Sequence, residues 1–276
     1  MTHMIYVVPS LKAKEKLQCE GKAWAESQGF AYVPRGKRTI QDLMDEYGED
    51  FLVYSSRGPQ IDRPEGSHFF SLNMAELRIQ NLRKGQRDHL LEALMGVKEY
   101  DLRPAAAQPP ISVLDCTCGF GADAAVASFG LPAGSRVDAL EVSPLLEAVT
   151  AWGFSHFVHK KDDVTAALRR ISLRCSDYRD YLLSDEGPVY DVLYFDPMFQ
   201  RPVEASCQFQ PVRAIMEHGG LTRNLIERAL QKARRRVVIK ERDFRQLCRD
   251  FPDVTLYGGK YSRIGYAVLE CDSWKK

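Results

Sequence analysis

The amino-acid sequence predicts an α/β protein: an open, mostly parallel sheet covered by helices, preceded by a smaller α/β domain. Three observations lead to this prediction. The chain has 276 residues, enough for one full domain and a smaller one. Short apolar runs alternate with helical patterns from residue 111 onward. Residues 103–110 hold three prolines, which cannot lie inside a regular helix or a central strand and therefore mark a connector.

The N-terminal part of the chain predicts a small α/β domain over residues 1–66 and a basic linker with the proline-rich connector over residues 67–110. In the small domain, strands are expected at 5–8 and 51–54 and helices at 13–28 and 40–47. In the linker, one helical pattern covers residues 73–94. Its basic side chains are Arg78, Arg83, Lys84 and Arg87.

The larger domain is predicted over residues 111–276. Its strands are expected at 111–114, 136–140, 171–175, 190–195, 236–239, 254–257 and 266–270. Its helices are expected at 121–129, after Ser143-Pro144, and at 222–233 and 244–249. Little chain separates the last two strands, so one of them should run antiparallel in an otherwise parallel, Rossmann-like sheet.

The composition is that of an ordinary globular protein, with 45% hydrophobic and 27% charged residues. No apolar run is long enough to span a membrane, and the N-terminus lacks the pattern of a secretory signal. The formal net charge of +1 gives no whole-molecule attraction to nucleic acid, so such binding would depend on local patches. The seven cysteines include no CxxC pair, which favours reduced thiols in a cytoplasmic protein and no metal site.

The most informative stretch is residues 113–123, which predict a buried strand, a glycine loop and the start of a helix. Gly119 and Gly121 let a ligand approach the backbone, whose N–H groups at a helix start favour an anionic group. Glu141 ends the next strand, where a carboxylate can accept hydrogen bonds from both ribose hydroxyls of a nucleoside. These residues therefore predict a nucleoside cofactor at the loop.

Acidic residues around the loop favour S-adenosylmethionine (SAM) over NAD. The third glycine of a dinucleotide fingerprint is missing, because Gly121 is followed by Ala122 and Asp123. Asp115, just before the loop, would repel a pyrophosphate. A sulfonium donor with an amino-acid tail fits better, since Asp115 or Asp123 can hold its ammonium group.

A second motif, Asp196-Pro197-Met198-Phe199, follows the fourth strand of the larger domain. Ligands of open α/β sheets bind outside the carboxyl ends of the strands, so this motif should face the same crevice as the glycine loop. The Asp196 carboxylate and the Pro197 carbonyl can each accept one N–H of an exocyclic amine, and Phe199 can stack on the base. A plain Asp-Pro turn is the alternative interpretation, and the matching glycine loop favours methyl transfer.

Together, these motifs resemble the bacterial ribosomal RNA small subunit methyltransferase J family. The resemblance is carried by Asp115-x-Thr117-x-Gly119-x-Gly121-x-Asp123, Glu141, Asp196-Pro197-Met198-Phe199 and Val237-Val238-Ile239-Lys240. It covers most of residues 73–270, and the region before it resembles a divergent, Gram-positive-type branch. The resemblance implies a class I SAM-dependent methyltransferase fold and methylation of guanine N2 in small-subunit ribosomal RNA.

The resemblance also implies which residues contact SAM. By position these are Ala122, Asp123, Glu141, Val142, Ser176, Asp177 and Asp196, beside the loop residues Asp115, Thr117, Gly119 and Gly121. The chain departs from the family at Val142, where a basic residue is usual, and at Asp177, where serine is usual. These departures bear on the target nucleotide and leave the fold and the donor unchanged.

Basic side chains mark where RNA phosphates are expected. The expected contacts are Arg83, Lys84, Arg201, Arg213 and Lys240. The segment 228–249 contains two acidic and nine basic residues. The basic residues are Arg228, Lys232, Arg234, Arg235, Arg236, Lys240, Arg242, Arg245 and Arg249. Each patch taken alone is equally compatible with a solvated helix face, and Lys240 with a side chain extending from the sheet edge.

The sequence thus predicts a SAM-dependent N-methyltransferase acting on an exocyclic amine of RNA, with guanine N2 of 16S ribosomal RNA as the target implied by the resemblance. Two alternatives remain open. One is methylation of adenine N6 in DNA or RNA, or of a protein amide. The other is an RNA-binding or ribosome assembly factor that binds SAM without turnover. The predicted transfer is a direct in-line displacement that needs neither a metal nor a covalent enzyme intermediate.

Overall fold

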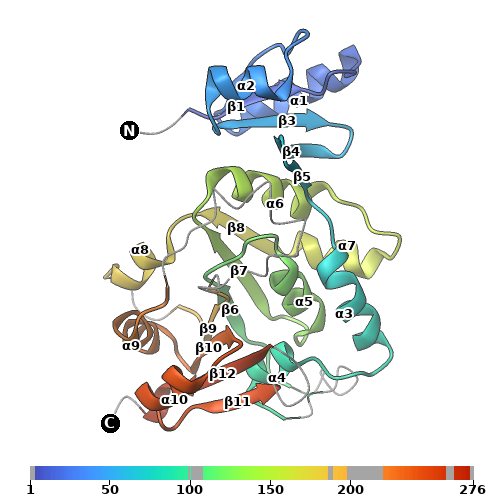
Figure 1. Cartoon of the computed structure of the whole chain (residues 1–276). Coiled ribbons are helices and arrows are strands. Elements are labelled where there is room, and N and C mark those ends of the chain that lie inside the picture. Colours follow the sequence, from blue (N-terminus) through green and yellow to red (C-terminus); the bar gives the residue numbers. More distant parts are fainter. Residues whose placement is uncertain are drawn as a thin grey trace. The chain divides into compact units, whose positions relative to one another are not determined.

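The computed structural model describes residues 4–98, 100, 108–185, 189–197, 220–258 and 264–273. Two compact units make up this part of the chain. The first unit holds the described residues up to Ser71 together with Ser143–Phe157, and the second unit holds the others. Figure 1 shows their helices and strands with the labels used here.

The first unit is built on a sheet with the strand order β2-β1-β3-β4-β5. These strands are β1 (Tyr6–Pro9), β2 (Ala31–Tyr32), β3 (Phe51–Ser55), β4 (Gly58–Arg63) and β5 (Gly66–Phe69). β1 is parallel to β2 and β3, whereas β4 is antiparallel to β3 and β5. The strands expected at 5–8 and 51–54 are confirmed as β1 and β3. The sheet continues past residue 66 because a hairpin of β4 and β5, both beginning with glycine, extends it.

Three helices of the described chain belong to this unit, namely α1 (Glu15–Ser27), α2 (Ile40–Tyr47) and α6 (Pro144–His156). The helices expected at 13–28 and 40–47 are confirmed as α1 and α2. The start expected at Ser143-Pro144 is confirmed too, since Ser143 Oγ accepts a hydrogen bond from Leu146 N at 3.4 Å. Helix α6 packs against β4, where the absent side chain of Gly58 makes room for the Trp152 ring.

The second unit is built on a sheet with the strand order β11-β12-β10-β9-β6-β7-β8. These strands are β6 (Ser112–Asp115), β7 (Arg136–Glu141), β8 (Ile171–Cys175), β9 (Val192–Phe195), β10 (Arg236–Glu241), β11 (Thr255–Gly258) and β12 (Gly265–Glu270). The five neighbouring strands β8, β7, β6, β9 and β10 pair in parallel. Strand β12 is antiparallel to both β10 and β11. The predicted Rossmann-like sheet with one antiparallel strand among the last two is therefore confirmed.

Helices cover both faces of this sheet (Figure 1). One layer contains α3 (Asn73–Arg83), α4 (His89–Met95), α5 (Ala122–Gly130) and α7 (Asp162–Arg169). The other contains α8 (Tyr178–Leu183) and α9 (Arg223–Lys232), and the short α10 (Arg245–Asp250) lies between β10 and β11 in the chain. The helices expected at 121–129, 222–233 and 244–249 are confirmed as α5, α9 and α10.

The single helix expected over residues 73–94 is wrong, because the chain forms two helices there. Gly85 has a φ of +75°, a left-handed conformation that ends α3 after Arg83. Asp88 then begins α4, since its Oδ1 accepts a hydrogen bond from Leu90 N at 3.0 Å. The helical pattern of side chains continues across the break, which is why periodicity alone does not reveal it.

The core of the second unit lies between the sheet and its helices. Apolar side chains of the central strands, including Leu114, Leu193, Phe195, Val237 and Ile239, are buried together. Parallel strands covered on both faces are mostly apolar along their length, although β7 buries Asp138 in its interior. The residues at the carboxyl ends of these strands are therefore the ones available for chemistry.

Helix α6 offers a test of the packing in the first unit. A Cβ atom on Gly153 would lie 1.9 Å from Cγ of Phe70, so Gly153→Val must displace that ring. We expect it to lower the free energy of unfolding by about 1–3 kcal/mol, measured by thermal and urea denaturation. Ser155→Val, at an exposed position of the same helix, is the control. Equal stabilities of the two variants would contradict this packing.

Candidate active site

Four parallel strands of the second unit place polar side chains at one edge of the sheet. Asp115 ends β6, Glu141 ends β7, Asp196 follows β9, and Lys240 is the penultimate residue of β10. The register pairs Asp115 with Tyr194 and Phe195 with Ile239, so these strand ends lie at the same level. The predicted meeting of the glycine loop and the Asp196 turn at one edge is confirmed.

The glycine loop, residues 116–121, joins β6 to α5 through two left-handed residues. Gly119 has a φ of +54° and Gly121 a φ of +75°, conformations that a side chain would strain. Among the described residues, the nearest neighbour of a Cβ atom placed on Gly119 would be the Thr117 carbonyl oxygen, 4.0 Å away. Gly119 N donates a hydrogen bond to Glu141 Oε2 at 2.9 Å, which fixes the loop against the end of β7.

The hydroxyl of Thr117 connects the glycine loop to the turn after β9. Thr117 Oγ1 accepts a hydrogen bond from Asp196 N at 2.7 Å. The backbone N–H of Thr117 in turn donates to Asp115 Oδ1 at 3.1 Å. Three residues from the ends of two neighbouring strands are therefore held in one hydrogen-bonded group.

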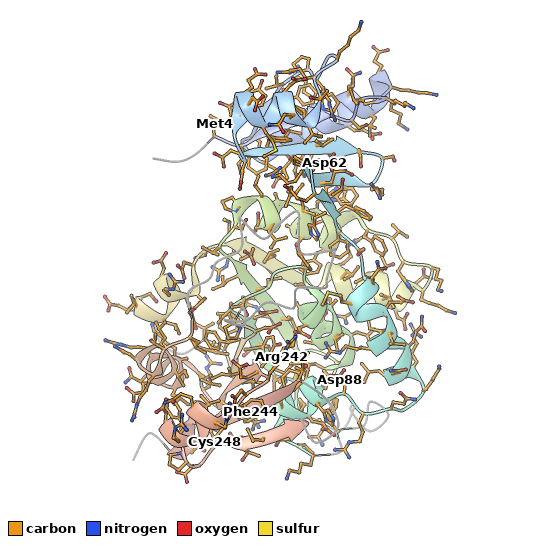
Figure 2. All side chains as sticks on the ribbon, in the orientation of Figure 1. Met4, Asp62, Asp88, Arg242, Phe244 and Cys248 are labelled. Atoms are coloured by element: carbon orange, nitrogen blue, oxygen red, sulfur yellow. The ribbon has the colours of Figure 1, made fainter. Side chains whose placement is uncertain are left out.

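Five charged residues form an alternating series, here called the charge row: Asp88, Arg78, Asp123, Lys240 and Asp196. Arg78 makes two hydrogen bonds of 2.8 Å to the Asp88 carboxylate and contacts Asp123 with a third nitrogen. Lys240 Nζ lies 2.8 Å from Asp123 Oδ2 and 2.7 Å from Asp196 Oδ2. Asp88, at the start of α4, is labelled in Figure 2. The row therefore runs from the α3–α4 break to the turn after β9.

Burial and neighbouring charges divide the carboxylates of the site into two kinds. Burial raises the pKa of Asp115 well above its ordinary value and that of Asp196 to about 6, despite the ammonium of Lys240. Burial acts on Asp123 in the same direction, but Lys240 and Arg78 outweigh it and hold the pKa of Asp123 low. Two carboxylates likewise keep the pKa of Lys240 high, so its side chain stays cationic. Asp196 can therefore change its proton near neutral pH.

Comparison with known proteins identifies the family. A family model described as "Putative SAM-dependent methyltransferase" matches residues 76–264, more than half of the chain. The chain belongs to this family. Its resemblance to the small subunit methyltransferase J proteins is confirmed by sequence as well, and SAM is the cofactor of the family.

Two relatives and one crystal structure show how far the similarity of this methyltransferase extends. The uncharacterized protein YpiP of Bacillus subtilis is 28% identical over 236 residues, covering 85% of this chain and 88% of YpiP. The ribosomal RNA small subunit methyltransferase J of Dechloromonas aromatica is 27% identical over 202 residues, covering 72% and 76% of the two chains. A SAM-dependent methyltransferase from Neisseria gonorrhoeae aligns with a TM-score of 0.60 at 17% identity, over 96% of this chain and 95% of that one, which shows the shared fold.

The residues around the glycine loop fit the chemistry of SAM. The ligand carries a sulfonium, an ammonium and two ribose hydroxyls, and the strand ends offer the carboxylates of Asp115, Glu141 and Asp196. No described side chain crowds the Gly119 backbone, where the ligand would approach. Among the described residues, Asp115 has no ion-pair partner, whereas Asp123 is occupied by Arg78, Lys240 and Tyr194. Asp115 is therefore the better of the two predicted partners for the ammonium group.

The remaining donor contacts implied by the resemblance lie near this edge. Ala122 is the first residue of α5, directly after the loop. Ser176 N donates a hydrogen bond to the Glu141 carbonyl at 3.0 Å, which brings the turn after β8 to the end of β7, beside Val142. Asp177 caps α8 and lies 3.4 Å from the Arg179 guanidinium. The turn after β8 can therefore border the donor site.

The structure describes three of the five residues expected to contact RNA phosphates, namely Arg83, Lys84 and Lys240. Phe199, Arg201 and Arg213 lie outside the described residues. Arg83 forms an ion pair with Asp163, and Lys84 is exposed at the end of α3. Lys240 neither reaches out from the sheet edge nor stands free for a phosphate, because two carboxylates enclose it.

The basic segment 228–249 does not form one continuous cationic surface. Lys232 and Arg236 are buried, the first against the Ser184 carbonyl and the second against Glu270. Arg245 forms an ion pair with Asp243. Figure 2 labels Arg242, Phe244 and Cys248, three residues that follow the strand β10. The exposed charge of the segment is thus smaller than the sequence count implies.

Two members of the site, Arg78 and Tyr194, were not assigned to it from the sequence, where Arg78 was only one of the basic residues of the linker. The Tyr194 hydroxyl donates to Asp123 Oδ2 at 2.7 Å, and Arg78 holds the other oxygen of that carboxylate. A tyrosine in a buried strand needs a partner for its hydroxyl, which was the available signal for Tyr194. Arg78 could not be placed in the site, because its partner Asp123 lies 45 residues away in the sequence.

The hydrogen bond of Thr117 provides a test of this arrangement. Thr117→Val keeps the shape of the side chain but leaves the Asp196 N–H without its acceptor. We expect the free energy of unfolding to fall by about 1–3 kcal/mol, measured by urea denaturation. Thr117→Ser retains the hydroxyl and should stay close to the wild type. Equal stabilities of the valine and serine variants would show that this hydrogen bond contributes nothing.

Proposed function

We propose that this protein is a SAM-dependent N-methyltransferase that acts on an exocyclic amine of RNA, with guanine N2 of 16S ribosomal RNA as its target. The observation that carries the proposal is the contact between the Asp196 turn and the glycine loop, made by Asp196 N and Thr117 Oγ1. This contact puts an amine acceptor beside the residues that fit SAM. Several similar proteins named ribosomal RNA small subunit methyltransferase J support the choice of RNA.

The turn after β9 can activate an amine that is otherwise a poor nucleophile. The lone pair of an exocyclic amine is delocalised into the base. The Asp196 carboxylate and the Pro197 carbonyl each accept one N–H, which directs the lone pair toward the methyl group and stabilises the charge that develops on nitrogen. Phe199, two residues further on, is proposed to stack on the base.

The glycine loop and the two strand ends beside it hold the donor in this proposal. When bound, SAM supplies an electrophilic methyl group on a sulfonium sulfur. Glu141 accepts hydrogen bonds from the ribose hydroxyls, and Asp115 pairs with the ammonium group. Asp196 lies at the same edge, so its carboxylate also stabilises positive charge between donor and amine.

RNA contacts are proposed for Arg83, Lys84, Arg201 and Arg213. Arg83 and Lys84 lie at the end of α3, within the described chain. The ion pair of Arg83 with Asp163 is at the surface, so phosphates can replace this carboxylate partner at little cost. An RNA substrate of this kind lies in the cytoplasm, where we expect the protein. Among the described residues, no helix has the length and hydropathy of a membrane span.

The Asp196 carboxylate is the most direct target for mutation. Asp196→Ala removes an acceptor that acts mainly in the transition state, so we expect methyl transfer to fall about a hundredfold or more. SAM affinity, measured by calorimetry, should change much less. Asp243→Ala removes an exposed aspartate after β10 and is the matched control.

The assay uses labelled SAM and small ribosomal subunits from a strain that lacks this protein, followed by mass spectrometry of the digested RNA. N2-methylguanosine is the expected product. Methyladenosine, or label in protein, would replace the proposed substrate by one of the alternatives. SAM and RNA binding without any incorporation would indicate a binding protein, and full turnover by Asp196→Ala would remove this carboxylate from the mechanism.

A further inference from the structure

The charge row contains a lysine whose position the proposed reaction does not yet use. The side chain of Lys240 is 13% exposed, and its ammonium lies between Asp196 Oδ2, at 2.7 Å, and Asp123 Oδ2, at 2.8 Å. We propose that Lys240 is a positioning residue for methyl transfer, whose ammonium holds one oxygen of the Asp196 carboxylate so that the other is presented to the amine. This inference rests on the proposed function, in which Asp196 accepts an N–H of the substrate.

The sheet gives Lys240 its place next to Asp196. Parallel pairing of β10 with β9 sets Ile239 opposite Phe195, so the residues that follow lie side by side. On its other side β10 pairs with β12, where Tyr266 is opposite Lys240. The lysine thus lies between two strands, and its ammonium extends to the carboxylates at the sheet edge.

Asp123, the second carboxylate that contacts Lys240, holds the ammonium in place beside Asp196. Asp123 is itself held from two sides, by the Arg78 guanidinium and by the Tyr194 hydroxyl, which lies 2.7 Å from Oδ2. Arg78 is anchored in turn by two hydrogen bonds to Asp88. An ammonium has three donors and no acceptor, and two of the donors of Lys240 are committed to this pair of oxygens. Lys240 is therefore a fixed charge beside Asp196 and not a mobile one.

The charges that face Asp196 explain why a fixed cation matters here. The groups around it are Lys240 and Glu241 on β10, Asp123 on α5, Asp115 on β6 and Tyr194 on β9, with Arg78 of α3 and Tyr266 of β12 beyond the ammonium. Among the described residues, Lys240 is the ion-pair partner of Asp196. Without it, a partly buried carboxylate would face other carboxylates and would take up a proton at a higher pH.

A protonated Asp196 is a poor hydrogen-bond acceptor, so loss of the lysine should change how the rate of methyl transfer depends on pH. As the amine nitrogen forms its bond to the methyl carbon, the carbon–sulfur bond breaks and its electron pair stays on sulfur. The surplus proton on nitrogen passes to the Asp196 carboxylate and then to water, while Lys240 remains an ammonium. The carboxylate must be ionised before each turnover, and the rate therefore falls on the acid side of the pKa of Asp196, which is about 6.

The test compares full-length wild type, Lys240→Met and Lys240→Arg between pH 5 and 9. In Lys240→Met, we expect the acid limb of kcat/KM to move up by about one pH unit, so that the rate relative to wild type is about fivefold lower at pH 6 than at pH 9. Lys240→Arg keeps the cation and should keep the limb near its wild-type position. A loss of equal size at every pH, or no loss at all, would overturn the inference.

Two further measurements keep the result interpretable. The double variant Lys240→Met/Asp123→Asn removes both members of one ion pair, so it should fold even where the single variant does not. Its acid limb should shift less than that of Lys240→Met, because one carboxylate near Asp196 is gone. Carbon-13 NMR of the Asp196 carboxyl, assigned with Asp196→Asn, follows its titration without any RNA. An Asp196 signal that titrates at the same pH with and without Lys240 overturns the role of the lysine. A wild type that labels no RNA refutes the proposed function alone.

Discussion

Between Asp123 and Asp196, two partly buried carboxylates of different elements, lies the ammonium of Lys240. Withdrawing charges from water is costly unless each charge is paired with an opposite one. The alternating charges of the charge row meet that condition by pairing every member with an opposite charge. Because the row includes residues of α3, α4, α5, β9 and β10, the ends of these elements are fixed relative to one another.

The glycine loop is likewise held at this edge of the sheet, by hydrogen bonds to residues at the ends of neighbouring strands. Gly119 is tied to Glu141 through its N–H, and Thr117 is tied to Asp196 through its hydroxyl. These bonds join the ends of β6, β7 and β9. The proposed donor and amine sites are therefore parts of one edge, built from short contacts between strand ends.

Much of this arrangement could be predicted from the sequence because it follows local rules. The apolar runs of the parallel strands, the Ser143-Pro144 helix start and the polar residues that end each strand are all visible in the printed letters. The break at Gly85 was missed because the helical pattern continues on both sides of it. The partners of Lys240 were missed because an ion pair between Lys240 and Asp123 depends on the order of strands in space, which a single sequence does not contain.

Methyl transfer as proposed requires the glycine loop and the Asp196 turn to open onto one pocket that holds the donor. A crystal structure of the full chain with S-adenosylhomocysteine would test this most directly. We expect the ribose hydroxyls on Glu141, the amino group near Asp115 and the sulfur facing Asp196. A ligand bound at another edge of the sheet, or with its sulfur directed away from Asp196, would contradict the proposed reaction.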